Sequence, residues 1–338
     1  MLNIAAFIQG INVPSSRFRV LQYVEPLENL NIRIKPFKSL VDAYPPRNRI
    51  LRPFWGIGLL SGHLPNVLNS YKCDITFFQR EMLSTFVTLE SLTKGPRIFD
   101  VDDAIWLHKR GGFNIKIFAK IYDLVICGNE FLADYFSQFL DKVVVLPTPV
   151  NTELFKPIFN SKYKLIIGWS GSGSNLKYLY EIEPALKIIL NKIPGAKLRI
   201  VTDSKPNFIT IAPEKIEFIR WSPVNEVSSI QEMTVGIMPL DDSPWSRGKC
   251  SFKMLTYMAC GVPVVVSPIG MNKEILAKGN IGFDPISHDE WVDAIVALLQ
   301  NSSQCNEMGQ NGVRVVAENY SVQTLAPVLA KILKEVER

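Results

Sequence analysis

The sequence lacks most of the features that mark exported, membrane-spanning or nucleic-acid-binding proteins. Its 338 residues contain no run of eighteen or more apolar residues, and residues 1–9 have neither the basic start nor the length of a signal peptide. The net charge of +5 is modest, and no recognised nucleic-acid-binding module accompanies it. We therefore expect a cytoplasmic protein that neither crosses a membrane nor binds nucleic acid.

Cysteine and histidine are also scarce. The five cysteines are scattered, odd in number and include no Cys-x-x-Cys pair, which disfavours a disulfide framework and a zinc site. We expect reduced thiols, four of them in the core. The three histidines, His63, His108 and His288, have no Glu or Cys at ligand spacing, so we interpret them as structural or surface residues.

What the chain does have is a regular alternation of apolar strands and amphipathic helices. With 47% hydrophobic residues, it is long enough for two cores of ordinary size. We predict an α/β fold of two Rossmann-like, doubly wound domains. Strands are expected at residues 3–9, 73–79, 97–103, 123–128, 142–150, 164–169, 197–202, 216–219, 235–239 and 264–266. Helices are expected at residues 80–92, 130–140, 176–191, 251–260, 287–299, 305–318 and 322–336.

The domain boundary is expected in the polar, proline-containing stretch that ends at Lys164. We place a first domain at residues 1–155, a second at 156–320 and a last helix at 321–338.

The segment from 241 to 274 carries the densest chemical information. Ser251 can cap a helix that Gly261 ends, and Arg247-Gly248-Lys249 leads into that helix. Free amides, the positive end of the helix dipole and nearby cations together favour an anion, most simply a phosphate. An ordinary surface helix with basic residues near its start is the alternative.

A second small-residue loop follows the strand at 164–169. It contains Gly171, Ser172 and Gly173, with Lys177 in the first turn of the next helix. Small residues let backbone amides approach a ligand, although the loop is neither a full Gly-x-Gly-x-x-Gly nor a P-loop.

Charged residues also gather where two strands of the first half end. Asp100, Asp102 and Asp103 follow each other at the end of the 97–103 strand, and Arg17 and Arg19 follow the first strand. Carboxylates so close together raise one another's pKa, so such clusters usually bind something. Ligand hydroxyls, a metal without further recognisable ligands, or a cap on the following helix are the possible partners.

A basic and aromatic stretch runs from residue 33 to 55. It has six cations against the single Asp42, with Phe37, Tyr44, Phe54 and Trp55 among or beside them. The combination suits an anionic lipid surface or a pyrophosphate-linked acceptor, and a solvated basic loop is the alternative.

Residues 248–272 form the pattern Gly-Lys-Cys-x-x-Lys-x-Leu-x-Tyr-Met-Ala-Cys-Gly-x-Pro-Val-Val-x-Ser-Pro-x-Gly-x-Asn. This pattern resembles the donor-binding segment of retaining family 4 glycosyltransferases with the GT-B fold. That family has a Glu-x7-Glu pair here, and Gly248 and Thr256 stand in its two places. Ser-Ser-Arg-Phe-Arg at 15–19 and Asp-Asp-Ala-Ile-Trp at 102–106 resemble the same branch.

The resemblance implies a role for each candidate residue. Asp102 and Asp103 stand where the family has a His-Asp that faces the transferred sugar, and we assign them as catalytic. Trp221 and Thr256 are expected at the nucleotide and ribose, and Arg17 and Arg19 on the acceptor side. The donor phosphates are assigned to Gly171, Ser172, Gly173, Lys177, Arg247, Gly248, Lys249, Cys250, Lys253, Gly270, Met271 and Asn272.

The activity implied is transfer of a sugar from a nucleotide-sugar to a saccharide or lipid-linked acceptor, with retention and without an obligatory metal or other cofactor. The first domain would bind the acceptor, the second would bind the donor across a cleft, and the last helix would pack back toward the first domain. Surface polysaccharide or cell-envelope glycan synthesis at the inner face of the cytoplasmic membrane is the expected setting. A sugar-nucleotide epimerase and an inactive nucleotide-sugar-binding scaffold remain the rivals.

Overall fold

The computed structural model describes residues 1–39, 41, 45–46, 48–83, 88–108, 115–158 and 164–337. It divides into two compact units, which are treated one at a time. The first unit comprises Met1–Pro149, Gly248–Cys250 and Val322–Arg338, and the second comprises Val150–Arg247 and Ser251–Ser321.

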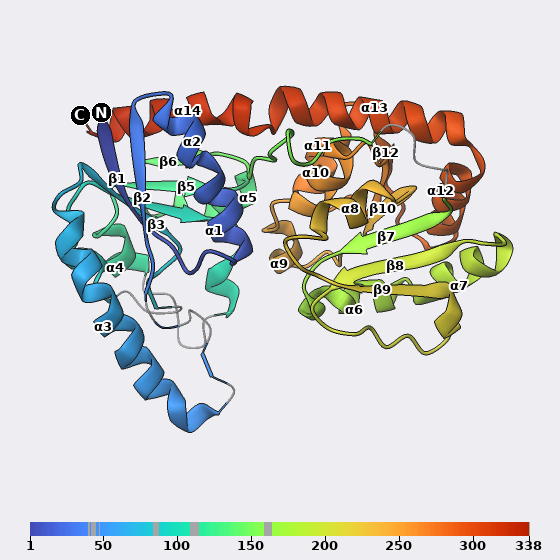
Figure 1. Ribbon diagram of the computed structural model, residues 1–338, viewed down its shortest axis with the longest axis horizontal. Helices are drawn as coiled ribbons and strands as arrows, with labels where there is room; N and C mark the ends of the chain where they lie inside the picture. Colours follow the sequence, from blue (N-terminus) through green and yellow to red (C-terminus); the bar gives the residue numbers. More distant parts are fainter. Residues whose placement is uncertain are drawn as a thin grey trace. The chain divides into compact units, whose positions relative to one another are not determined.

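The first unit is built on a six-stranded parallel sheet with the strand order β2-β1-β3-β4-β5-β6 (Figure 1). After β2 the chain crosses back over β1 to β3, so the sheet switches its direction of growth between β1 and β3. In doubly wound sheets, ligands bind beyond the carboxyl ends of strands at such a switch point. The strands are β1 (Leu2–Phe7), β2 (Ile32–Phe37), β3 (Ile75–Gln79), β4 (Arg97–Val101), β5 (Leu124–Cys127) and β6 (Val143–Val145).

Helices cover this sheet, and one of them comes from the far end of the chain. Helix α14 places Val322, Leu325, Leu329 and Leu333 at helical spacing, and all four are buried in one core with Ile4 of β1. The helices of the first unit are α1 (Pro14–Arg19), α2 (Val24–Glu28), α3 (Arg52–Ser70), α4 (Ile115–Ala119), α5 (Glu130–Phe136) and α14 (Val322–Glu337).

The second unit has its own six-stranded parallel sheet, in the order β12-β11-β10-β7-β8-β9. Its switch point lies between β7 and β10. The strands are β7 (Ile166–Ser170), β8 (Lys197–Thr202), β9 (Ile216–Arg220), β10 (Val235–Met238), β11 (Val264–Val266) and β12 (Gly282–Phe283). The predicted fold class, two doubly wound α/β sheets, is thus confirmed.

The helices of the second unit follow the expected alternation with one interruption. The helix predicted at 176–191 is broken at Ile182, because Pro184 starts a new helix in its first turn. Helix α12 begins with a capping box between Ser287 and Glu290. The helices are α6 (Leu176–Glu181), α7 (Glu183–Lys192), α8 (Glu226–Gln231), α9 (Pro244–Arg247), α10 (Phe252–Ala259), α11 (Met271–Leu276), α12 (His288–Gln300) and α13 (Ser302–Asn319).

The helix predicted at 80–92 is wrong for the residues that the structure describes. Arg80 has a φ of 64°, and only a short 3-10 turn forms at Glu90–Leu92. The carboxylate of the buried Glu90 accepts hydrogen bonds from the backbone amides of Met82 and Thr88. The Glu90 carboxylate therefore takes up backbone amides on both sides of residues 84–87, which lie outside the described chain.

Strand β2 and helix α3 are among the elements of the first unit that were not predicted. β2 alternates buried Ile32 and Ile34 with the more exposed Arg33 and Lys35. The strand was missed because these two cations made it look like part of a basic loop. Helix α3 follows where only a basic and aromatic pattern was noted. Of that pattern, Asp42, Tyr44 and Arg47 lie outside the described residues.

All five cysteines are free and buried. We expected four of them to be in the core. No helix in the described part of the chain is both long and apolar enough to span a bilayer.

Candidate functional site

The switch point of the second unit brings two predicted segments together. Helix α10 carries Lys253 and Tyr257 one turn apart, so both point to the end of β7. The backbone amide of Ser170 donates to the Tyr257 hydroxyl at 2.7 Å, and Lys253 Nζ lies 4.4 Å from the centre of the Trp169 ring. We call Trp169, Ser170, Gly171, Lys253 and Tyr257 the β7–α10 corner.

Gly171 is what lets Lys253 reach this corner. A Cβ atom on residue 171 would lie 2.6 Å from Lys253 Cε and would overlap its ammonium group. The lysine therefore lies directly against the glycine backbone and the face of Trp169, where the ring attracts a cation. A positive charge is thus fixed at the carboxyl edge of the sheet, where an anionic ligand is expected.

The amides of the glycine loop have partners within the protein. Gly171 N donates to Val201 O at 3.0 Å, and Gly173 N donates to the Asp203 carboxylate at 2.6 Å. The predicted amide cradle for phosphate is therefore not formed by these two N–H groups. The Ser172 hydroxyl is exposed and bonds to Ser174 and Asn175 of its own turn.

The other predicted phosphate cations lie beside carboxylates that follow β10. Lys177 Nζ is 3.9 Å from Asp241, and Arg247 Nε is 2.7 Å from Asp242. Both cations have exposed side chains, and such surface pairs contribute little to stability. Lys177 and Arg247 are therefore second to Lys253 as candidates for a phosphate contact.

The entrance to α10 differs from the predicted cap. Ser251 has a φ of 50° and makes no capping bond, and its hydroxyl donates instead to Asn272 Oδ1 at 2.7 Å. Asn272 is buried and donates to Ser267 O, so it braces the loop rather than a ligand. At Gly270, with a φ of 52°, a Cβ would lie 2.8 Å from Arg247 O, so only glycine fits this turn.

Three further residues were predicted at the donor. Thr256 is buried and its hydroxyl donates to Lys253 O, which differs from the exposed hydroxyl that a ribose contact needs. Met271 is buried in the first turn of α11. Trp221 directly follows β9 and is half-buried, so part of its side chain is exposed.

Gly248, Lys249 and Cys250 belong to the first unit rather than to the β7–α10 corner. Cys250 Sγ donates to Asp102 O at 3.1 Å, and Asn129 donates to Lys249 O at 3.1 Å. A Cβ on residue 248 would lie 2.7 Å from the Ala104 Cβ. These residues pack against the end of β4, and burial raises the pKa of the Cys250 thiol well above its ordinary value.

Asp102 and Asp103, just beyond β4, share one partner that the sequence did not reveal. Arg80, which directly follows β3, lies 2.7 Å from Asp102 Oδ1 and also pairs with Asp103. β3 and β4 are neighbouring parallel strands, so their carboxyl ends lie at the same edge of the sheet. This rule could have predicted from the sequence that Arg80 lies near Asp102 and Asp103. Both carboxylates remain partly exposed, so they can meet a ligand while Arg80 holds them.

Arg19 is a structural residue and not an acceptor contact. It is 2% exposed, and its Nε lies 3.0 Å from Asp100 Oδ2 while Nη1 donates to Leu146 O at 2.7 Å. Burial alone would lower the Arg19 pKa, but the Asp100 carboxylate more than offsets this and raises it. Arg17, half-buried, lies over the Phe18 ring at 4.6 Å.

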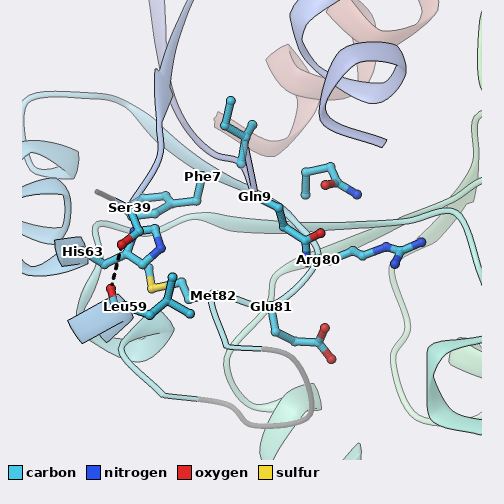
Figure 2. A pocket seen from close by; sticks show the side chains of 10 residues that line it. Phe7, Gln9, Ser39, Leu59, His63, Arg80, Glu81 and Met82 are labelled. Carbon is cyan, nitrogen blue, oxygen red and sulfur yellow. Dashed lines mark hydrogen bonds between the residues drawn. The ribbon is translucent and has the colours of Figure 1, made fainter. Parts of the chain in front are cut away.

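A pocket opens at the switch point of the first unit (Figure 2). Gln9 and Phe7 come from the end of β1, Arg80 and Glu81 from the end of β3, and His63 from α3. His63 Nδ1 and both amide atoms of Gln79 are buried there with no hydrogen-bond partner in the described chain. Because unsatisfied buried polar groups are costly, this pocket is suited to a water or a ligand hydroxyl.

Burial of His63 makes the stability of the protein depend on pH. Burial lowers the His63 pKa to about 4, whereas the unfolded chain titrates near the ordinary value of about 6.5. Below pH 6.5 the unfolded state therefore binds the proton first, and stability falls until the pH approaches 4. We expect a loss of about 1–2 kcal/mol between pH 7 and pH 5.

Denaturant unfolding at the two pH values, on wild type and on His63→Gln, measures this contribution. The variant should lose less stability than wild type over the same interval. Equal losses in both proteins would contradict the assignment.

No three His, Cys, Asp or Glu side chains within the described ranges are placed to hold a metal ion.

Each of the two units is a doubly wound, parallel α/β sheet with polar and charged side chains at the carboxyl ends of its strands. This is the GT-B class of fold, and the comparisons with known proteins give the same fold. Residues 164–301 match the family Glycosyl transferases group 1. All of the matched residues except Gly248–Cys250 lie within the second unit.

Solved structures support the fold over the whole chain. Sucrose-phosphate synthase from Thermosynechococcus elongatus superposes with a TM-score of 0.72 and 15% identity, covering 99% of both chains. The structure of Anabaena HepE in complex with UDP and glucose has a TM-score of 0.71 and 14% identity, covering 99% of this chain and 100% of that one. A glycosyltransferase from Rickettsia africae has a TM-score of 0.69 and 14% identity, covering 99% of this chain and 98% of that one.

A curated relative is similar in sequence. The probable sucrose-phosphate synthase of Thermosipho melanesiensis is 24% identical over 223 residues, which cover 61% of this chain. The match spans 50% of that synthase, about half its length.

Proposed function

We propose that this protein transfers a sugar from a nucleotide-sugar to a saccharide or lipid-linked acceptor, with retention. The observation that carries the proposal is the β7–α10 corner, where Lys253 lies on Gly171 and Trp169 at the switch point of the unit that matches the family. HepE structures hold UDP, glucose and UDP-glucose, which makes UDP-glucose the first donor to test.

In this proposal the second unit contributes to catalysis by electrostatic stabilisation of the leaving group. As the bond to the sugar breaks, negative charge develops on the departing diphosphate, and a fixed cation stabilises that charge most when it is already in place. Lys253 is held in place by the Trp169 ring and the glycine backbone, so little reorganisation is needed. No protein nucleophile and no metal is required in this scheme.

The first unit supplies the groups for the acceptor. The switch-point pocket offers the neutral His63 imidazole and the Gln79 amide, which pair with hydroxyls rather than with charges. Asp102 and Asp103 present carboxylate oxygens just beyond β4, the strand next to β3 in the sheet, and Arg80 pairs with both of them. A hydroxyl-rich saccharide matches both features. Surface polysaccharide or cell-envelope glycan synthesis on the cytoplasmic side of the membrane is the setting we propose.

Product analysis tests the proposal directly. The protein is incubated with UDP-glucose and other nucleotide-sugars, with and without a mixture of saccharide and polyprenyl-linked acceptors. We expect nucleoside diphosphate release that depends on the acceptor, together with an acceptor heavier by one sugar in the mass spectrum. Conversion of the sugar without an acceptor would favour an epimerase that uses Asp102 or Asp103 as its base. Binding without any turnover would favour a scaffold.

The two carboxylates beyond β4 provide the matched variants. We expect Asp102→Asn and Asp103→Asn to lower turnover by about a hundredfold or more, the lower end of what a lost general acid or base costs. Because both side chains are partly exposed, the loss of stability should be smaller than the loss of turnover. Wild-type turnover in both variants would remove these residues from the site.

A further inference from the structure

Helix α3 carries an apolar stripe on the side that faces away from its own unit. Leu59, His63 and Val67 are buried on one side of the helix. On the opposite side Ile50, Phe54, Ile57, Leu64, Leu68 and Tyr71 are between 49% and 77% exposed. Within α3, Phe54, Ile57, Leu64 and Leu68 follow one another at three, four or seven residues and so share one side of the helix. Ile50 and Tyr71 lie just beyond its two ends, and we call the six residues together the α3 stripe.

The stripe is too large to be a chance exposure of single side chains. Isolated apolar residues on a surface are normal, but a contiguous patch of several large ones marks an interaction surface. Leu92 extends the patch, because it is exposed and its carbonyl accepts a hydrogen bond from the Tyr71 hydroxyl. Figure 1 shows α3 running beyond the sheet of its unit as one long helix.

The charges of α3 and its two ends, residues 49–72, have a single sign. Arg49 and Arg52 are exposed at its beginning and Lys72 is exposed at its end. No Asp or Glu occurs between residues 49 and 72. An apolar line flanked by cations and free of carboxylates is the composition of a helix that lies in the interface of an anionic bilayer.

A second copy of the chain fits this surface poorly. If two stripes met in parallel, Arg49 and Arg52 would lie beside the same residues of the other copy. If they met antiparallel, these arginines would lie beside Lys72. Like charges are brought together in both arrangements, with no carboxylate on the helix to balance them.

We propose that the α3 stripe is a membrane-docking surface, in which the apolar side chains enter the acyl boundary of an anionic leaflet while Arg49, Arg52 and Lys72 contact the lipid phosphates. The helix lies along the bilayer and does not cross it, because its opposite side is part of the first unit's core. This surface does not depend on the proposed sugar transfer.

Vesicle flotation tests the proposal. The full chain is mixed with vesicles of equal parts phosphatidylglycerol and phosphatidylcholine, and separately with pure phosphatidylcholine. We expect binding to the anionic vesicles at low salt, weaker binding to the neutral ones, and release as salt rises. Failure of the wild-type protein to float with either vesicle would overturn the proposal.

Variants locate the surface. Ile57→Glu and Leu68→Glu lie on the stripe, and each should lower the partition coefficient about tenfold or more. Ile209→Glu is the matched control, since Ile209 is an 87% exposed residue of the second unit, and it should bind as wild type does. Replacing both Arg49 and Arg52 by Gln should lower the preference for anionic lipid about fivefold for each charge.

Two measurements separate docking from other effects. The stripe residues are exposed, so the Glu variants should keep the thermal unfolding midpoint of wild type. Sedimentation equilibrium without lipid should show the same oligomeric state for wild type and for Ile57→Glu. Unchanged flotation of the stripe variants would refute membrane docking. So would a wild-type dimer that does not bind vesicles and that becomes a monomer in Ile57→Glu.

Discussion

Replacing Arg19 by methionine should lower the free energy of unfolding by about 3–5 kcal/mol, because it leaves the Asp100 carboxylate charged in the core without its partner. Arg19 and Asp100 are 2% and 1% exposed, so solvent cannot take over the missing interaction. The variant also removes the donor to Leu146 O, a backbone acceptor inside the unit. Chemical denaturation at neutral pH measures the change.

Two further variants define the cause. Arg17→Met changes a half-buried arginine of the same helix and should cost clearly less. The double variant Arg19→Met with Asp100→Leu should recover much of the lost stability, since removing both charges also removes the unpaired one. A loss below about 1 kcal/mol in the single variant would show that the pair is not held as the structure places it.

Replacing Lys253 by alanine should weaken the binding of a nucleoside diphosphate by about 1.5–3 kcal/mol, the value of a hydrogen bond to a charged group. The binding of the nucleoside alone should change little. Lys253 stands near the beginning of α10, where its charge opposes the helix dipole, so an anion is the partner that its position fits. Calorimetric titration with UDP and with uridine, on wild type and variant, gives both numbers.

Arg247→Ala is the matched control for this experiment. Arg247 is exposed and already paired with Asp242, so its loss should weaken diphosphate binding less than the loss of Lys253 does. Equal weakening of UDP and uridine by Lys253→Ala would mean that the lysine does not contact the phosphates.

The sequence predicted the sheets well because buried parallel strands are short, apolar and separated by helices. The helix predicted at 130–140 is observed as α5, and Asn129 caps its start, with Leu132 N donating to Asn129 Oδ1 at 3.0 Å. The prediction failed where a charged strand, β2, satisfied the alternating pattern only with Arg and Lys on its exposed side. It also failed in the described parts of 80–92, where Arg80 has a positive φ and the buried Glu90 carboxylate accepts from the Met82 amide.

The candidate site was predicted in its parts but not in its pairings. The strand-end carboxylates, the glycine loop and Lys253 were all identified from the sequence. That Arg19 pairs with Asp100, and Arg80 with Asp102 and Asp103, depends on which strands are neighbours in the sheet. Local patterns carry no information on that order. His63 was dismissed for lack of metal-ligand spacing, whereas its significance lies in being buried at a switch point without a partner for Nδ1.

The central claim is that the second unit holds the nucleotide part of the donor at the β7–α10 corner. Hydrogen exchange of the backbone amides with and without UDP tests it directly, because a bound ligand slows local opening where it makes contact. We predict slower exchange in residues 169–177 and 251–257 when UDP is present. Unchanged exchange in these two segments, or protection confined to the first unit, would contradict the claim.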